Sequence, residues 1–335
     1  MSLKNKCVLI TGGAGFIGSH IVGSLLEKCE NIIVYDNFST GTKENLVNFT
    51  QNKNLKIVKA DILDYKTLKK YVSEVDIVSH HAAELEVFTG IFDMHHDMKV
   101  NIEGTLNVLK ASMDSNVKKV IFASSGALYG QAQHIPENEE HPLNPHWPYG
   151  VSKLAGEKYC TVAYNLYGLP TVSLRYGIVY GPREWYGRVL TLFIKRCINR
   201  DPPIIFGDGM QTRDFVYVSD IVDAHNSAID KNNADGKSFN VGSGTGTSVK
   251  ELAKLVIELS GTKVKPIFDD PPEGKESKYQ RGRKRLVGEL KEFIYDIRYA
   301  GEILQYRPKV DIRTGIKREI NWVRQNPHRW TKIRV

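Results

Sequence analysis

Short runs of apolar residues alternate with longer amphipathic stretches over the first half of the chain. The runs are apolar at nearly every position, a pattern typical of strands that are buried on both faces. The predicted strands are 6–10, 32–35, 55–58, 77–80 and 120–123. Helical periodicity is clearest over 101–116 and 149–167. This alternation predicts a doubly wound parallel sheet of the α/β class, in which ligands bind beyond the carboxyl ends of the strands.

A glycine-rich turn joins the first predicted strand to the first predicted helix. Gly12, Gly15 and Gly18 have the spacing Gly-x-x-Gly-x-x-Gly. Glycines at these positions permit a tight turn, a close approach of the backbone to a pyrophosphate, and close packing of helix on strand. The phosphates then bind free N–H groups at the positive end of the helix. The turn predicts a dinucleotide site of the Rossmann type.

The second predicted strand ends at Asp36, at the spacing that a dinucleotide-binding fingerprint requires. A carboxylate there accepts hydrogen bonds from both hydroxyls of the adenosine ribose and repels a 2′-phosphate, so we expect NAD rather than NADP. Asp61 and Ile62 are placed to reach the adenine, and Ala82 and Ala83 are small enough to let the backbone approach the cofactor. The alternative is a structural glycine turn followed by a solvated aspartate.

A tyrosine and a lysine have the spacing of a proton-transfer pair. Tyr149 and Lys153 lie four residues apart in the predicted helix 149–167, so they share one face of it. An ammonium group near a phenol stabilises the phenolate and lowers the pKa of the phenol from about 10. Ser124 and Ser125 follow the fifth predicted strand, and a proline-containing loop lets a strand-end serine face the tyrosine. The arrangement predicts a proton-abstracting site beside a nicotinamide.

Composition excludes several other classes of protein. No stretch approaches about 18 uninterrupted apolar residues, so we expect no membrane span. The four cysteines are scattered singly, which argues against zinc and disulfide frameworks and for a reducing cytoplasm. The histidines and cysteines show no metal-ligand spacing, so we expect no metal site.

The net charge is +8, and basic residues gather in 275–285 and 317–335. A solvated basic surface is the plainest interpretation, and a nucleic-acid surface is an alternative. A third interpretation is that one or two arginines hold a substrate phosphate. The other motifs favour the third, so we expect no nucleic-acid partner.

Motifs along nearly the whole chain resemble those of the extended short-chain dehydrogenases/reductases, in their NAD-dependent epimerase/dehydratase branch. The resemblance lies in TGGAGFIGSH, YDNFSTG, ADILD, NIEGTLNVL, SSGALYG, PYGVSK, LRYGIVYGPR, FGDGMQTRDFVYVSDIVDA and FNVGSGTGTSV. Counting back from Tyr129 in SSGALYG, the resemblance places the catalytic serine at Ser125. Tyr149 and Lys153 complete the implied catalytic set.

The resemblance also implies a domain organisation and a set of ligand-binding residues. An NAD-binding Rossmann domain covers 1–176 with a return segment at about 214–245, and a smaller C-terminal α/β subdomain for a nucleotide sugar covers 177–213 and 246–335. The residues expected at the cofactor are Gly12, Gly15, Phe16, Ile17, Gly18, Asp36, Asn37, Ser39, Thr40, Gly41, Asp61, Ile62, Ala82, Ala83, Asn101, Tyr149, Lys153 and Tyr176. Those expected at the substrate are Glu86, Ser125, Tyr149, Ile204, Phe206, Arg213, Arg285 and Phe293.

Two positions separate the chemistries of this branch. Dehydratases that resemble this chain carry an Asp-Glu pair after the catalytic residue, and related decarboxylases also have an acid nearby. Gly126 and Ala127 stand there and cannot exchange protons. The resemblance therefore implies epimerisation as in UDP-glucose 4-epimerase. Tyr149 would take the 4-hydroxyl proton, NAD would take and return the hydride, and the 4-keto sugar would turn in between.

Other residues bear on which sugar is bound. The favoured substrates are UDP-glucose and UDP-galactose or their N-acetylamino forms. Gly177 and Ile178 replace the family's phosphate-binding asparagine, and Glu84 and Glu86 stand near the sugar, where small or amide residues are commoner. The resemblance implies that Phe293 holds a position whose size gates N-acetylated sugars in 4-epimerases, and that its bulk favours plain glucose and galactose.

Two arginines are expected at the substrate's diphosphate. Arg213 matches the family's first phosphate-binding arginine, and Arg285 is one position out of register with the second. Arg283 is the less favoured alternative to Arg285. Ile204 and Phe206 match the wall on which the nucleobase packs, although core packing would explain Ile204 equally well.

Helices 101–116 and 149–167 carry more apolar positions than one sheet face needs. The resemblance implies that they pair across a two-fold axis to form a homodimer. Two other functions stay open, namely another nucleotide-sugar epimerase or dehydratase, and a non-catalytic NAD-binding regulator that uses its basic face on nucleic acid. The set Ser125, Tyr149 and Lys153 argues against the regulator.

Overall fold

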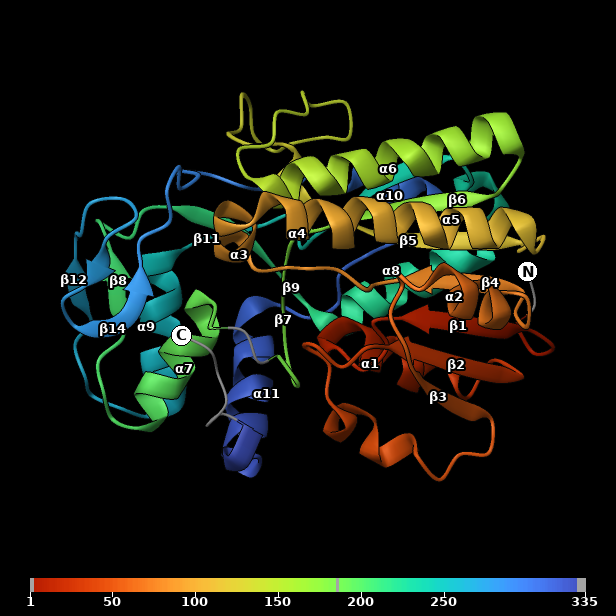
Figure 1. The fold of residues 1–335 in the computed structure, drawn as a ribbon. Helices are drawn as coiled ribbons and strands as arrows, with labels where there is room; N and C mark the ends of the chain where they lie inside the picture. Colours follow the sequence, from red (N-terminus) through yellow and green to blue (C-terminus); the bar gives the residue numbers. More distant parts are fainter. Residues whose placement is uncertain (1–2, 185–186, 330–335) are drawn as a thin grey trace.

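The computed structural model describes residues 3–184 and 187–329 and contains a seven-stranded parallel sheet (Figure 1). Its strands are β1 (Cys7–Thr11), β2 (Asn31–Asp36), β3 (Leu55–Lys59), β4 (Ile77–His80), β5 (Lys119–Ser125), β6 (Thr171–Tyr176) and β10 (Lys237–Val241). Their order is β10-β6-β5-β4-β1-β2-β3, and every neighbouring pair is parallel. This order is the Rossmann arrangement, so the predicted fold class is confirmed.

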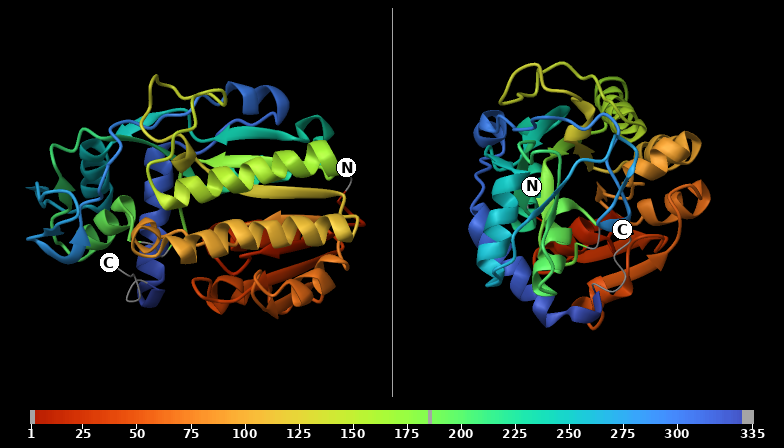
Figure 2. Two further views of the ribbon diagram at one scale, coloured as in Figure 1. Left: turned by 45° about the horizontal axis from the view of Figure 1, so that its top comes forward. Right: turned by 90° about the vertical axis from the view of Figure 1, so that its left-hand side faces the viewer.

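Helices cover both faces of this sheet. They are α1 (Phe16–Leu25), α2 (Tyr65–Val72), α5 (Gly104–Asp114), α6 (Pro148–Tyr167) and α8 (Val218–Asp230). Val8 and Ile10 of β1 pack in the core that includes α1 and α8, whereas Leu9 packs in the core that includes α2, α5 and α6. Figure 2 shows α5 and α6 side by side on their face of the sheet. The strands are apolar throughout because neighbouring side chains are buried on opposite faces.

The predicted helix 149–167 is confirmed as α6, which starts at Pro148 and ends before Gly168. Proline suits the first helical position because its missing N–H would find no partner there, and Gly168 ends the helix with a φ of 67°. The predicted start of helix 101–116 is wrong. Residues Lys99–Glu103 form a wider π turn, and α5 follows from Gly104. Apolar periodicity does not distinguish a π turn from an α turn.

A second group of elements lies beyond the carboxyl ends of the large sheet, at the left of Figure 1. It includes α7 (Val189–Ile198), β8 (Ile204–Phe206), α9 (Val249–Ser260), β12 (Ile267–Asp269), β13 (Glu276–Ser277), β14 (Gln280–Lys284) and α11 (Ile312–Gln325). A three-stranded sheet is made of β11 (Gly246–Ser248), β9 (Thr212–Tyr217) and β7 (Ile178–Tyr180).

The remaining elements are short. They are α3 (Val87–Phe92), α4 (Met94–Met98), α10 (Arg298–Ile303) and the 3-10 turns η1 (Lys43–Phe49), η3 (Gly126–Leu128), η4 (Asn232–Ala234) and η5 (Pro327–Arg329). Within residues 3–184 and 187–329, none of the helices combines the length and the apolar character needed to cross a bilayer.

Candidate active site

A cavity of about 260 Å³ lies at the carboxyl ends of the large sheet. Its walls come from the segments that follow β1, β2, β3, β4, β5 and β6, and from the first turns of α1 and α6. Segments far apart in the sequence meet here because parallel strands all end at one edge of the sheet. The cavity is therefore where the fold predicts a ligand.

The glycine turn forms one wall of the cavity. Gly12 has a φ of 66°, which residues other than glycine rarely adopt. A Cβ atom on Gly12 would also lie 2.7 Å from the backbone nitrogen of Ala82, and one on Gly18 would collide with the Gly12 carbonyl. No side chain caps the start of α1, so its first N–H groups stay available to phosphate oxygens.

Asp36 is buried at the end of β2, beside the glycine turn. Its two carboxylate oxygens accept hydrogen bonds from the backbone N–H groups of Ala14 at 2.9 Å and Phe38 at 2.8 Å. Burial raises the pKa of Asp36, and these two hydrogen bonds oppose that rise. Each oxygen keeps a lone pair, so the carboxylate can still accept two ribose hydroxyls. These residues fit the adenosine half of NAD.

Ser125, Tyr149 and Lys153 line the same cavity. Ser125 ends β5, Tyr149 is the second residue of α6, and Lys153 follows one turn later. Ser125 lies close enough to the Tyr149 phenol to favour its ionised form. Lys153 Nζ lies 5.8 Å from the centroid of the Tyr149 ring and donates to the Ala123 carbonyl at 2.8 Å. The structure thus brings the three predicted residues together.

The structure corrects the expectation that Lys153 lowers the pKa of Tyr149. Burial raises the pKa of Tyr149 to about 12, and the hydrogen bond from Ser125 and the charge of Arg188 oppose it only in part. Burial likewise lowers the pKa of Lys153 to about 8. The Lys153 ammonium points to the Ala123 carbonyl rather than to the phenol oxygen, so it stabilises the phenolate less than the spacing suggests.

Two residues expected at the cofactor do not line the cavity. Asn101 accepts a hydrogen bond from the Glu84 N–H at 2.9 Å and donates to the Glu84 carbonyl at 3.0 Å. It also donates to the Asp97 carboxylate at 2.9 Å. Gly41 packs against Asp36. Both residues therefore support the cavity wall from behind.

All the other predicted cofactor residues line the cavity. Glu84, expected near the sugar, also lines the cavity. Sequence reasoning assigned no ligand role to the following wall residues: Tyr35, Ala60, Leu63, His81, Leu85, His96, Val100, Ala123, Ser124, Gly177, Val179, Glu184 and Arg188. Many of them end a strand of the sheet or directly follow one. This position in the sequence is the feature that could have identified them as residues of the ligand site. Glu184 and Arg188 lie far beyond β6 along the chain and carried no such signal.

Glu184 and Arg188 add opposite charges to the cavity wall. Glu184 Oε1 lies 4.0 Å from Arg188 Nε. Burial raises the pKa of Glu184 to about 7, and Arg188 and Thr191 oppose that rise. Arg188 also favours the ionised form of Tyr149, so the charge of this wall affects the pKa of that phenol.

Tyr176, predicted at the cofactor, is held by a chain of neutral groups. The Tyr176 hydroxyl lies 3.2 Å from His81 Nε2, and Ser79 Oγ lies 3.1 Å from His81 Nδ1 and 2.8 Å from His225 Nε2. Burial lowers the pKa of both histidines, that of His225 to about 4. This wall therefore supplies hydrogen bonds without adding positive charge.

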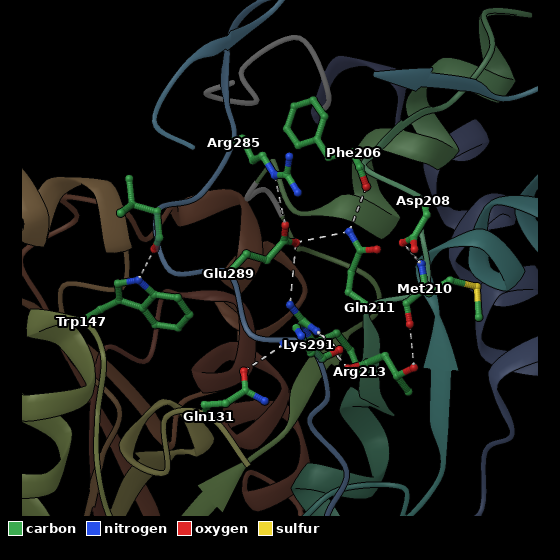
Figure 3. Close-up of polar contacts among 12 residues, drawn as sticks. Gln131, Trp147, Phe206, Asp208, Met210, Gln211, Arg213, Arg285, Glu289 and Lys291 are labelled. Atoms are coloured by element: carbon green, nitrogen blue, oxygen red, sulfur yellow. Dashed lines mark hydrogen bonds and ion pairs between the residues drawn. The ribbon is translucent and has the colours of Figure 1, made fainter. Parts of the chain in front are cut away.

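The residues expected at the nucleotide of the substrate meet outside this cavity, around Glu289 (Figure 3). One carboxylate oxygen of Glu289 lies 3.8 Å from Arg213 Nη2, and the other lies 3.8 Å from Arg285 Nε. Gln211 Nε2 donates to Glu289 at 3.3 Å and to the Phe206 carbonyl at 3.1 Å. The structure thus gathers Arg213, Arg285 and Phe206 in one place.

Three other residues expected at the substrate serve as packing or capping groups and do not line the cavity. Ile204 is fully buried in β8. Phe293 is buried against Tyr295, with ring centroids 4.8 Å apart. Glu86 caps α3 by accepting a hydrogen bond from the Phe88 N–H at 3.3 Å.

The chain matches a known protein family over most of the sheet. Residues 8–242 match the model of the NAD dependent epimerase/dehydratase family. A Methanocaldococcus jannaschii protein is 39% identical over 325 residues, which are 95% of this chain and 99% of that protein. A UDP-glucose 4-epimerase of Mycolicibacterium smegmatis is 34% identical over 322 residues, 94% of this chain and 98% of that protein.

Relatives with other activities match about as well. The UDP-N-acetyl-alpha-D-glucosaminuronate decarboxylase of Bacillus cytotoxicus is 34% identical over 335 residues, 96% of this chain and 99% of that protein. Among solved structures, the UDP-glucose 4-epimerase of Thermotoga maritima with UDP-glucose has a TM-score of 0.86 and 36% identity, and the match covers 96% of this chain and 99% of that one.

Proposed function

Since the chain belongs to the NAD dependent epimerase/dehydratase family, we propose that it interconverts the C4 epimers of a nucleotide sugar through a 4-keto intermediate. UDP-glucose and UDP-galactose, or their N-acetylamino forms, are the proposed substrates. The M. smegmatis relative and the T. maritima structure, whose names give this activity, support the choice. The cofactor is NAD, as in the rest of the family.

One observation carries the choice of epimerase over dehydratase. The two residues after Ser125 are Gly126 and Ala127, which cannot exchange protons. A Cβ atom on Gly126 would collide with the Phe293 ring and with the Tyr295 hydroxyl. An acidic side chain therefore has no room at the position where dehydratases of this family carry one.

The proposed mechanism assigns a role to each residue of the catalytic set. NAD, when bound, supplies the hydride acceptor and donor. Ser125 orients the substrate's 4-hydroxyl, and Tyr149 takes its proton and later returns it. Lys153, with a pKa of about 8, is mostly protonated at neutral pH and holds a hydroxyl of the nicotinamide ribose. Tyr176 and His81 supply a neutral wall beside them.

A second candidate is an epimerase or dehydratase that acts next to the keto carbon. Glu84 and Glu184 line the cavity, and a carboxyl group with a pKa of about 7, such as Glu184, suits proton abstraction near neutral pH. This reaction would place a solvent-derived proton on the sugar, whereas the proposed 4-epimerisation would not.

The experiment that tests the proposal uses this difference. The purified protein is incubated with UDP-, dTDP-, GDP- and CDP-sugars in ²H₂O without added NAD, and the products are followed by NMR. We expect one sugar to change configuration at carbon 4 with no deuterium in its ring. Deuterium next to carbon 4, or loss of water, would favour the second candidate, and no turnover of any sugar would contradict both.

We also propose a domain division and an assembly. NAD would be bound by 1–176 with 214–245, and the nucleotide sugar by 177–213 with 246–335. A homodimer would form through α5 and α6. The outer face of α6 supports this assembly, because Val151, Leu166 and Tyr167 are 51%, 73% and 67% exposed in the single chain.

A further inference from the structure

The segment after α11 carries an arginine that reaches the NAD-binding part of the molecule. Arg329 lies in η5, where its backbone N–H donates to the Asn326 carbonyl at 3.1 Å. Its guanidinium lies 5.8 Å from the centroid of the Trp322 ring, which belongs to α11. Only 12% of the Arg329 side chain is exposed. The backbone turn and the ring therefore fix the direction in which this arginine points.

Arg329 contacts two neighbouring residues of η1, the turn that follows β2. Its Nε lies 3.2 Å from the Glu44 carboxylate, and its Nη2 donates to the side-chain oxygen of Asn45, 284 positions away in the chain. The Glu44 side chain is 48% exposed, whereas Asn45 is buried. A half-exposed ion pair contributes little, so the hydrogen bond to Asn45 is the more consequential of the two contacts.

Asn45 connects this arginine to the glycine turn. Its side-chain Nδ2 donates to the Ala14 carbonyl at 2.8 Å. An arginine can only donate hydrogen bonds, so it requires the amide oxygen of Asn45 on its own side and leaves the amide N–H for Ala14. The Ala14 N–H in turn donates to the Asp36 carboxylate at 2.9 Å. Three successive hydrogen bonds thus link Arg329 to the carboxylate expected at the adenosine ribose.

The start of η1 is packed directly on the glycine turn. The Ala14 carbonyl accepts a second hydrogen bond, from the Thr42 N–H at 3.0 Å, and the Asn45 N–H donates to the Thr42 carbonyl at 3.1 Å. A Cβ atom on Gly41 would lie 2.9 Å from the backbone carbon of Ala14 and 3.0 Å from Asp36 Oδ1. Because so little space separates the two segments, a shift of η1 also shifts the phosphate-binding turn.

We propose that Arg329 is a positioning residue of the NAD site. It fixes the Asn45 amide, and through that amide it keeps Ala14 and the glycine turn in the form that binds the dinucleotide. Arg329 does not line the cavity, so it acts through η1. The inference depends on NAD and not on the sugar, so a failure of the proposed 4-epimerisation would leave it standing.

Exchange of bound NAD for isotopically labelled NAD tests this role. The purified protein with its bound NAD is incubated with excess labelled NAD, and the label that becomes bound is measured over time. Arg329→Met keeps packing on the Trp322 ring but removes every donor. Release of NAD should therefore accelerate about tenfold or more, the scale of a lost hydrogen bond to a charged group.

A matched control lies in the same helix. Arg324, in the last turn of α11, donates from Nη2 to the Ser260 carbonyl at 2.8 Å. Arg324→Met removes an arginine that joins α11 to α9 rather than to η1. Its NAD exchange should stay within about twofold of the wild type, the scale of an exposed charge. Equal acceleration by Arg324→Met and Arg329→Met would overturn the assignment.

Two further variants separate positioning from a general loss of stability. Asn45→Ala removes the connecting amide, so it should accelerate exchange, and adding Arg329→Met should then change the rate by less than about twofold. Arg329→Lys keeps a charge beside Glu44 but lacks the fork that holds both partners, so its exchange should be intermediate even if Arg329→Met folds poorly. A wild-type exchange rate in either Arg329 variant, or an undiminished effect of Arg329→Met in the Asn45→Ala background, would contradict the proposal.

Discussion

Tyr149 has to lose a proton in the proposed reaction, yet burial raises its pKa to about 12. The phenol therefore stays protonated near neutral pH unless positive charge reaches it, and Arg188 is a described cation that favours its ionised form. The spacing of Tyr149 and Lys153 correctly predicted that the two side chains lie on one face of α6. The direction of the ammonium toward Ala123 was not predictable, because it depends on a carbonyl in β5 that only the folded sheet brings close.

Removal of the phenol oxygen tests the assigned base. Tyr149→Phe keeps the ring and loses one hydroxyl, so stability and NAD content should barely change. Turnover should fall about a hundredfold or more, the scale of a lost general acid–base. Ser125→Ala is the milder comparison, since water can partly replace its hydroxyl. Near wild-type epimerisation by Tyr149→Phe would refute the mechanism.

Lys153, which lies one helical turn after Tyr149, should behave differently when it is replaced. Lys153→Ala is expected to lower activity and also to release NAD, because the proposed mechanism gives the ammonium a role both at the active site and at the cofactor ribose. NAD content is read from the absorbance of the nucleotide set free by denaturation. A Lys153→Ala protein with full NAD occupancy would show that the lysine does not hold the cofactor.

Glu137 makes the stability of the protein depend on pH. It is buried with both oxygens unpaired, and burial raises its pKa from 4.5 to about 8, with Asp214 adding to the effect. A folded-state pKa above the unfolded one means that stability is lost as pH rises from about 4.5 through 8. The melting temperature of the wild type should therefore fall between pH 6 and pH 9 by more than that of Glu137→Gln. Glu140→Gln, at an exposed position, should follow the wild type.

At the scale of elements, the strands and α6 were predictable because their apolar patterns follow directly from burial. The start of α5 was not, since the apolar pattern does not distinguish the π turn at Lys99–Glu103 from an α turn. Sequence also could not show that Phe293 lies against Gly126. That packing joins a segment near residue 293 to the end of β5, and no local pattern encodes such a distant contact.

The packing at Gly126 predicts what happens when an acid is introduced there. Gly126→Asp should lower the free energy of unfolding by about 1–3 kcal/mol, because the side chain collides with Phe293 and Tyr295. Ala127→Asp, at a position that already has a Cβ, should cost less. Thermal denaturation measures both. A stable Gly126→Asp protein that eliminates water from the sugar would contradict the role given to this position.

At the scale of the whole molecule, the exposed apolar face of α6 predicts a dimer. Light scattering at micromolar concentration should give twice the chain mass of 37.8 kDa. Leu166→Glu should give a monomer, since Leu166 is 73% exposed and the change leaves the core intact. Val47→Glu, at a position 60% exposed in η1, is the matched control and should remain dimeric. A monomeric wild type would refute the assembly.

The position of β10 in the sheet has a consequence for folding during synthesis on the ribosome. β10 pairs with β6 along its whole length, yet it is synthesised about sixty residues later. At about 5–20 residues per second, the nascent chain spends several seconds with β6 as an open sheet edge. Such an edge pairs readily with other chains. Cells that make this protein should therefore need a chaperone to shield β6 during translation, and ribosome pausing before residue 237 should increase aggregation.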